Sequence, residues 1–308
     1  MLYCSHMKRH LKTILASTII VATISAFAYY IHSHPEIVRQ LKHTSPFAVV
    51  AILGVYGVSF WAYVLITRVS LRMYHKTLSV QENFLFNAYS SLVNFFGPGQ
   101  SGPIFRGAYL KKRHNLGVRQ FTFTVVLYLA FFAVINAFLM FVGSRPWWQT
   151  ALLVLVVSVL SLAFIKWYKK RSDIDADSGL TPFNIAWLFG AAALQIASLA
   201  VVYGIELAQV HAHASVGQVL SYTGVANFSL YVAVTPGAIG IREAFLVFSQ
   251  HLHHIHNTNI VAANLIDRAA YLLFLGLLFI FVLSLHAKDK LHVSQLKIAT
   301  TPEQKSDS

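Results

Sequence analysis

Residues 94–110 have the sequence NFFGPGQSGPIFRGAYL, and residues 227–246 have the sequence NFSLYVAVTPGAIGIREAFL. Both contain Asn-Phe, then Pro-Gly-x-x-Gly, then an arginine followed by an aromatic residue and leucine. Each lies in an apolar segment, where Pro and Gly break a helix and free backbone groups that lipid cannot satisfy. A pair of broken segments at corresponding places in two halves of a membrane protein indicates the substrate site of a transporter.

The composition is that of an integral membrane protein. Hydrophobic residues make up 56% of 308 positions and charged residues 11%, and the mean hydropathy is +0.59. The formal net charge of +13 does not indicate nucleic acid binding, because the basic residues lie in short loops between apolar segments, where orientation and anionic lipid explain them. The single cysteine, Cys4, excludes an intramolecular disulfide.

The hydropathy pattern predicts an all-α polytopic fold with six full transmembrane helices and two re-entrant hairpins. A crossing needs about 20 apolar residues. The hairpins are predicted at Phe84–Leu110 and Val216–Ser249, and the crossings at Thr13–Ile31, Pro46–Ile66, Phe121–Val142, Trp148–Tyr168, Phe183–Ile205 and Ile260–Leu285.

The distribution of Lys and Arg predicts the orientation. With both termini in the cytoplasm, the inner segments hold most of the basic residues, and the hairpins enter from opposite faces, as in an inverted repeat. We therefore expect one membrane domain over residues 1–290, with inverted halves at about 13–168 and 183–285, and a disordered cytoplasmic tail over 291–308. The expected location is the bacterial inner membrane.

The candidate substrate-binding residues lie in and around the two breaks. Exposed amides and a helix start after each break suit an anionic headgroup, and arginine can grip a phosphate through two hydrogen bonds. Asp267 and Arg268 are adjacent in the last span, and one of them is expected to meet Arg242 or Glu243, as a structural ion pair or as a coupling site. The predicted set is Asn94, Pro98, Gly99, Gln100, Ser101, Gly102, Arg106, Asn227, Pro236, Gly237, Gly240, Arg242, Glu243, Asp267 and Arg268.

Several polar residues are expected to have no such role. Glu82 and Glu206 fall at span ends, where solvent contact is the simpler interpretation. The histidines between His251 and His256 have metal-like spacing but no accompanying carboxylate or thiol, so we expect an exposed outer loop. No catalytic constellation, metal site or cofactor site is predicted.

The chain resembles the lysylphosphatidylglycerol synthase transmembrane family, also called flippase-like. The residues that carry the resemblance are Thr235 to Ala244, Asn94 to Leu110, and Asp267-Arg268. Its two-part members move an aminoacylated phospholipid between leaflets and make it with a soluble domain, which we expect this chain to lack. Pro103 departs from the family pattern, in which an acidic residue often follows the glycine.

The resemblance implies a translocator of a phospholipid or lipid-linked amphiphile, with membrane lipids of anionic headgroup as partners. Two alternatives stay open: a membrane-embedded transferase using a polyprenyl-linked donor, for which only Glu82 and Glu243 are plausible carboxylates, and a non-transporting scaffold. A homo-oligomer and a separate lipid-modifying enzyme are also open as partners.

Overall fold

The computed structural model describes residues 42–96, 101–142, 147–171, 179–231 and 241–299, with a few isolated positions between 21 and 39. This part of the chain is helical, with no strand. Its helices are α3 (Pro46–Arg72), α4 (Val80–Phe96), α5 (Ser101–His114), α6 (Val118–Phe141), α7 (Trp147–Arg171), α8 (Pro182–Gln209), α9 (Val216–Ser229), α10 (Ile241–Phe248), α11 (Gln250–His253) and α12 (Asn257–Ala299).

Within the described residues, five helices are long and apolar enough to cross a membrane: α3, α6, α7, α8 and α12. They match five of the six predicted crossings. The predicted first crossing, Thr13–Ile31, lies outside the described residues apart from isolated positions. The protein is therefore an all-α polytopic membrane protein. Helix α12 continues to Ala299, past Leu291, where the predicted disordered tail begins.

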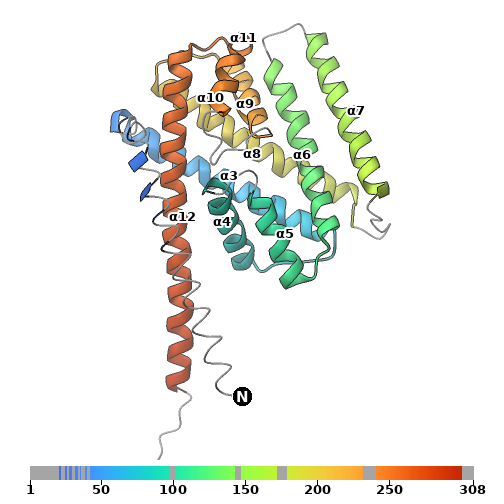
Figure 1. Cartoon of the computed structure of the whole chain (residues 1–308), viewed down its shortest axis with the longest axis vertical. Helices are drawn as coiled ribbons and strands as arrows, with labels where there is room; N and C mark the ends of the chain where they lie inside the picture. The colour runs from blue at the N-terminus through green and yellow to red at the C-terminus, as the bar shows by residue number, and fades with distance from the viewer. Residues whose placement is uncertain are drawn as a thin grey trace, which may run out of the picture.

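Helices α3 and α8 run antiparallel and form the centre of the molecule (Figure 1). At one end the backbone amide of Ser45 donates to Gln209 Oε1 at 3.2 Å, and at the other the amide of Gly179 donates to the Met73 carbonyl oxygen at 2.7 Å. Thr181 caps the start of α8 by accepting from the Asn184 amide, and proline follows it at the first helical position. The two ends of this pair define the two ends of the membrane domain.

The two broken segments form helical hairpins at opposite ends of the α3 and α8 pair. Helices α4 and α5 lie at the end marked by Met73, and α9 and α10 at the end marked by Gln209 (Figure 1). The connections at residues 73–79 and 210–215 are short, so each hairpin starts where the preceding span finishes. This is the arrangement that the inverted repeat predicts.

Helix α7 differs from the other spans because it packs mainly against α6. Its apolar side chains are exposed along its length, among them Leu152, Leu155, Val159 and Leu160. An apolar helix with one main neighbour among the described helices is the form expected at the lipid-facing edge of a membrane domain.

Candidate functional site

A cavity of about 340 Å³ lies between the two hairpins. It is bounded by α3, α4, α5, α6, α8, α10 and α12, so segments from both halves of the chain enclose it. Five predicted site residues line it: Asn94, Arg106, Arg242, Asp267 and Arg268. The structure thus brings the arginines of both hairpins to one space in the middle of the molecule.

The charged residues of the second hairpin are joined to α12 by two ion pairs. Arg242 Nη1 donates to Asp267 Oδ2, and Arg268 Nε donates to Glu243 Oε1 at 2.8 Å. The hydroxyl of Tyr56 also donates to Asp267. Since adjacent residues on a helix point about 100° apart, each charge on α12 meets a different charge on α10. The one contact expected from the sequence is present, a second pair accompanies it, and together they fix α10 against α12.

Arg106, at the corresponding place in the first hairpin, has different surroundings. It is 6% exposed, and its guanidinium lies over the Tyr63 ring at 4.5 Å from the centroid. Its Nε has no hydrogen-bond partner, and no described carboxylate lies within ion-pair distance. The cavity therefore contains a buried cation that the described part of the chain does not neutralise.

The remaining described residues of the predicted set shape the hairpins. Asn94 Oδ1 accepts from the Gly102 amide at 3.2 Å, and Ser101 Oγ donates to the Val93 carbonyl oxygen at 2.7 Å. Both contacts close the first hairpin. Asn227 is fully buried outside the cavity and donates to Asn136 Oδ1 at 2.9 Å. The other predicted residues lie outside the described residues: Pro98, Gly99, Gln100, Pro236, Gly237 and Gly240.

Tyrosines on several helices also line the cavity, and the sequence analysis missed them: Tyr56, Tyr63, Tyr128, Tyr203, Tyr231 and Tyr271. A signal was present in α3, where Tyr56, Ser59, Phe60 and Tyr63 recur at i, i+3, i+4 and i+7 and so share one helix face. Hydroxyl groups and a buried guanidinium thus place polar groups in a cavity whose lining is otherwise mostly apolar.

Two expectations about ionisable residues are wrong. Glu206 is not solvated at a span end; it is 1% exposed, because α8 extends past it to Gln209 and the second hairpin covers it. His253 is not in an exposed loop; its Nε2 faces the Leu246 carbonyl oxygen at 3.0 Å, and its Nδ1 accepts from the Ile255 amide at 3.2 Å. His251, His254 and His256 are exposed, as expected.

The two carboxylates on which a transferase would depend are both engaged. Glu243 pairs with Arg268, as described. Glu82, at the base of the first hairpin, accepts from Tyr109 Oη at 2.7 Å and contacts His114 Nε2 at 2.8 Å. Burial raises the pKa of Glu82, but the Tyr109 and His114 hydrogen bonds and the nearby charges of His114 and Arg113 outweigh it and hold the pKa below its usual value.

The fold and the cavity define a polytopic α-helical membrane protein in which two hairpins from opposite ends enclose an arginine-containing site. The family model described as the lysylphosphatidylglycerol synthase TM region matches residues 14–278. The chain belongs to this family. Neither the search of curated proteins nor the search of solved structures returned a match.

Proposed function

We propose that the protein moves a lipid with an anionic headgroup between the leaflets of the bacterial inner membrane. The observation that carries the proposal is Arg106, a buried guanidinium without a carboxylate partner among the described residues, in a cavity enclosed by both hairpins. Family membership supports a role in lipid metabolism or movement.

The electrostatics of the cavity favour an anion. An unpaired charge in a medium of low dielectric constant is unfavourable by several kcal/mol or more, so a site that retains one favours a ligand of opposite charge. Arg242 and Arg268 each have a carboxylate, whereas Arg106 lies over the Tyr63 ring and has no carboxylate partner among the described residues. A phosphate can accept two parallel hydrogen bonds from one guanidinium, which makes it the headgroup chemistry that suits Arg106.

The polar groups around Arg106 would hold the rest of a headgroup. Tyr128, whose hydroxyl donates to Gln195 Oε1 at 2.8 Å, lines the cavity with Gln195, and Ser90 lines it from α4. The volume of about 340 Å³ is within the usual range of small-molecule sites. We infer that the headgroup occupies the cavity while the acyl chains stay in the surrounding lipid.

Transport by Arg106 variants in reconstituted vesicles tests the proposal. With a fluorescent phosphatidylglycerol, Arg106→Ala should slow movement between leaflets at least about tenfold, the effect of losing about 1.4 kcal/mol of binding. Arg106→Lys should retain only part of the wild-type rate of lipid movement, because lysine keeps the charge but not the planar fork. Arg113→Ala is the matched control, since that side chain is 70% exposed. Wild-type rates in both Arg106 variants would contradict the proposal.

We also propose that the end of the molecule marked by Met73 faces the cytoplasm. The basic residues Arg68, Arg72, Lys111 and Lys112 are grouped at this end, as the positive-inside rule expects. In a Cys4→Ser background, a cysteine at His211 should react with an impermeant reagent only from the outside. Reaction only from the inside would reverse the orientation.

A further inference from the structure

Glu206 is a buried acid whose carboxyl group has no hydrogen-bond donor among the described residues and meets the carboxyl group of another acid, Asp267. It is 1% exposed in α8, and neither Oε1 nor Oε2 has a hydrogen-bond donor among the described residues. The other carboxylates described above differ in this respect: Asp267 has Arg242 and Tyr56, Glu243 has Arg268, and Glu82 has Tyr109 and His114. The Glu206 carboxyl group is therefore placed where an ionised form is least stable.

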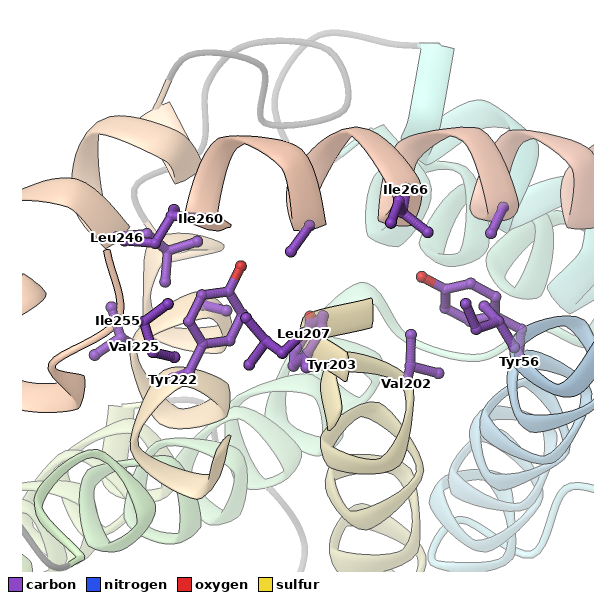
Figure 2. Packing of buried hydrophobic residues seen from close by; sticks show 14 of the residues in the cluster. Tyr56, Val202, Tyr203, Leu207, Tyr222, Val225, Leu246, Ile255, Ile260 and Ile266 are labelled. Atoms are coloured by element: carbon purple, nitrogen blue, oxygen red, sulfur yellow. The ribbon is translucent and has the colours of Figure 1, made fainter. Parts of the chain in front are cut away.

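Every element around Glu206 contributes a titratable or charged side chain. Asp267 of α12 and Arg242 of α10 interact with it electrostatically, as do Tyr56 of α3 and Tyr222 of α9, and Tyr203 lies one turn before it on α8. Figure 2 shows Tyr56 and Tyr222 packed on either side of Tyr203 and Leu207, with their hydroxyl groups turned toward α12. Arg242 is the single cation in this group of six.

The charges of this group do not balance when both acids are ionised. Arg242 is bonded to Asp267, so an ionised Glu206 would be a second buried anion with no donor, which is unfavourable by several kcal/mol. Asn264 Oδ1, whose amide nitrogen donates to Tyr222 Oη at 3.2 Å, is a further buried acceptor without a donor here. The Glu206 and Asp267 carboxyl groups meet, and a hydrogen bond between two carboxyl groups needs one proton, which a protonated Glu206 supplies.

We propose that Glu206 is a proton-binding site, coupled through Arg242 to the movement of an anionic lipid. The coupling rests on the function proposed above. When a phosphate draws Arg242 from Asp267, Asp267 and Glu206 are left without their shared cation, and the pair binds a proton more tightly. By linkage, proton binding favours release of Arg242 to the phosphate to the same extent. The proton and the anion then cross together.

Infrared spectroscopy of the whole protein in lipid tests the proton site without any transport. The wild type should show the carbonyl stretch of a protonated carboxyl group at neutral pH, and Glu206→Gln should lack it while folding normally, because glutamine is neutral and of the same shape. Glu82→Gln is the control and should retain the band. Absence of the band from the wild type, or its presence in Glu206→Gln, would overturn the proton site.

A proton gradient across reconstituted vesicles tests the coupling. Wild-type protein should move fluorescent phosphatidylglycerol away from the acidic side at least about fivefold faster than without a gradient, a typical coupling strength. Glu206→Gln should move it at one rate in both conditions, and Glu82→Gln should respond as the wild type does.

The outcomes separate the two proposals. Lipid movement by the wild type that ignores the gradient would overturn the coupling and leave the proposed function in place. A wild type that moved no lipid would overturn the function and the coupling together, and the infrared band would still decide whether Glu206 holds a proton.

Discussion

The two hairpins share a sequence pattern but are anchored differently. The first, α4 and α5, is closed by hydrogen bonds between its own helices, and no ion pair among the described residues joins it to a neighbouring helix: Asn94 accepts from the Gly102 amide, and Ser90 Oγ donates to the Gly102 carbonyl oxygen at 3.2 Å. The second, α9 and α10, is held by its neighbours. Ser221 Oγ donates to the Met140 carbonyl oxygen of α6 at 2.7 Å, and Arg242 and Glu243 pair with α12.

This difference distinguishes the two arginines that follow the breaks. Arg242 lines the cavity but is paired with Asp267, which holds α10 against α12. The first hairpin is anchored to α3 by neutral hydrogen bonds from Thr67 to Asn87 and from Asn83 to the Val64 carbonyl oxygen, and Arg106 faces the cavity. Equivalent positions in the repeat thus differ in this structure: Arg242 is paired with a carboxylate, and Arg106 has none among the described residues.

The largest expected effect separates these arginines by stability. Arg242→Ala should lower the free energy of unfolding by about 3–5 kcal/mol, because Asp267 is left buried and unpaired. Arg106→Ala should lower it by less than about 2 kcal/mol, the range of the lost contact with Tyr63. Thermal unfolding in detergent measures both, and adding Asp267→Ala to Arg242→Ala should recover part of the loss. Equal losses in the two single variants would contradict the division of roles.

The second prediction concerns the contact between α9 and α6. A Cβ at Gly224 would lie 2.7 Å from the Asn136 carbonyl oxygen, where backbone meets backbone. Gly224→Ala should therefore lower stability by about 1–3 kcal/mol through overpacking. Gly190→Ala is the control, because no atom lies within 4 Å of that Cβ, and it should gain up to about 1 kcal/mol from helix propensity. A neutral Gly224→Ala would show that α9 is not held by close packing.

The asparagines of the repeat should show a smaller difference of the same kind. Asn227→Ala removes a hydrogen bond between two helices and leaves Asn136 Oδ1 without that donor, for a loss of about 1 kcal/mol. Adding Asn136→Ala should then have little further effect. Asn94→Ala should instead increase hydrogen exchange of the Gly102 amide within its own hairpin. Exchange mass spectrometry of both variants checks this, and loosening of α6 in Asn94→Ala would count against the internal closure of the first hairpin.

The smallest expected effect is a difference in acid sensitivity. Burial lowers the pKa of His253 below its ordinary value of 6.5, so its contribution to the second hairpin is present above pH 6.5 and is lost as pH falls through the lowered pKa. The pKa of Glu82 is held below its ordinary value of 4.5. Its contribution to the first hairpin is therefore present above pH 4.5 and is lost as pH falls through the lowered pKa.

Hydrogen exchange across this pH range should show α9 to α11 loosening before α4 and α5. His253→Gln should remove the acid-induced loosening of α9 to α11, and Glu82→Gln should remove that of α4 and α5. Simultaneous loosening of both hairpins in the wild type would contradict these assignments.

Much of the fold could be predicted because it depends on local sequence. The length and hydropathy of a segment determine whether it spans a membrane, and α3, α6, α7, α8 and α12 fall where the sequence placed them. Pro and Gly mark both breaks, since they remove helical hydrogen bonds whatever the surroundings. Part of the site could be predicted as well: Asn94, Arg106, Arg242, Asp267 and Arg268 do line one cavity.

The partners of those residues could not be predicted. Arg106 and Arg242 have the same place in the repeat, and only the packing of α10 on α12 gives one of them a carboxylate. Glu206 and His253 were expected in solvent, yet the second hairpin and its turn bury both. Burial depends on residues distant in the chain, and the hydropathy of a single position does not report it.

The sequence by itself determined that this is an all-α membrane protein of the lysylphosphatidylglycerol synthase TM family, with two broken segments and a basic end. The tertiary structure decided which charges cancel and which remain. The physical reason is that the cost of a buried charge depends on its nearest partner, and that partner lies on another helix: Asp267 is 25 residues beyond Arg242, while Arg106 has no such carboxylate among the described residues.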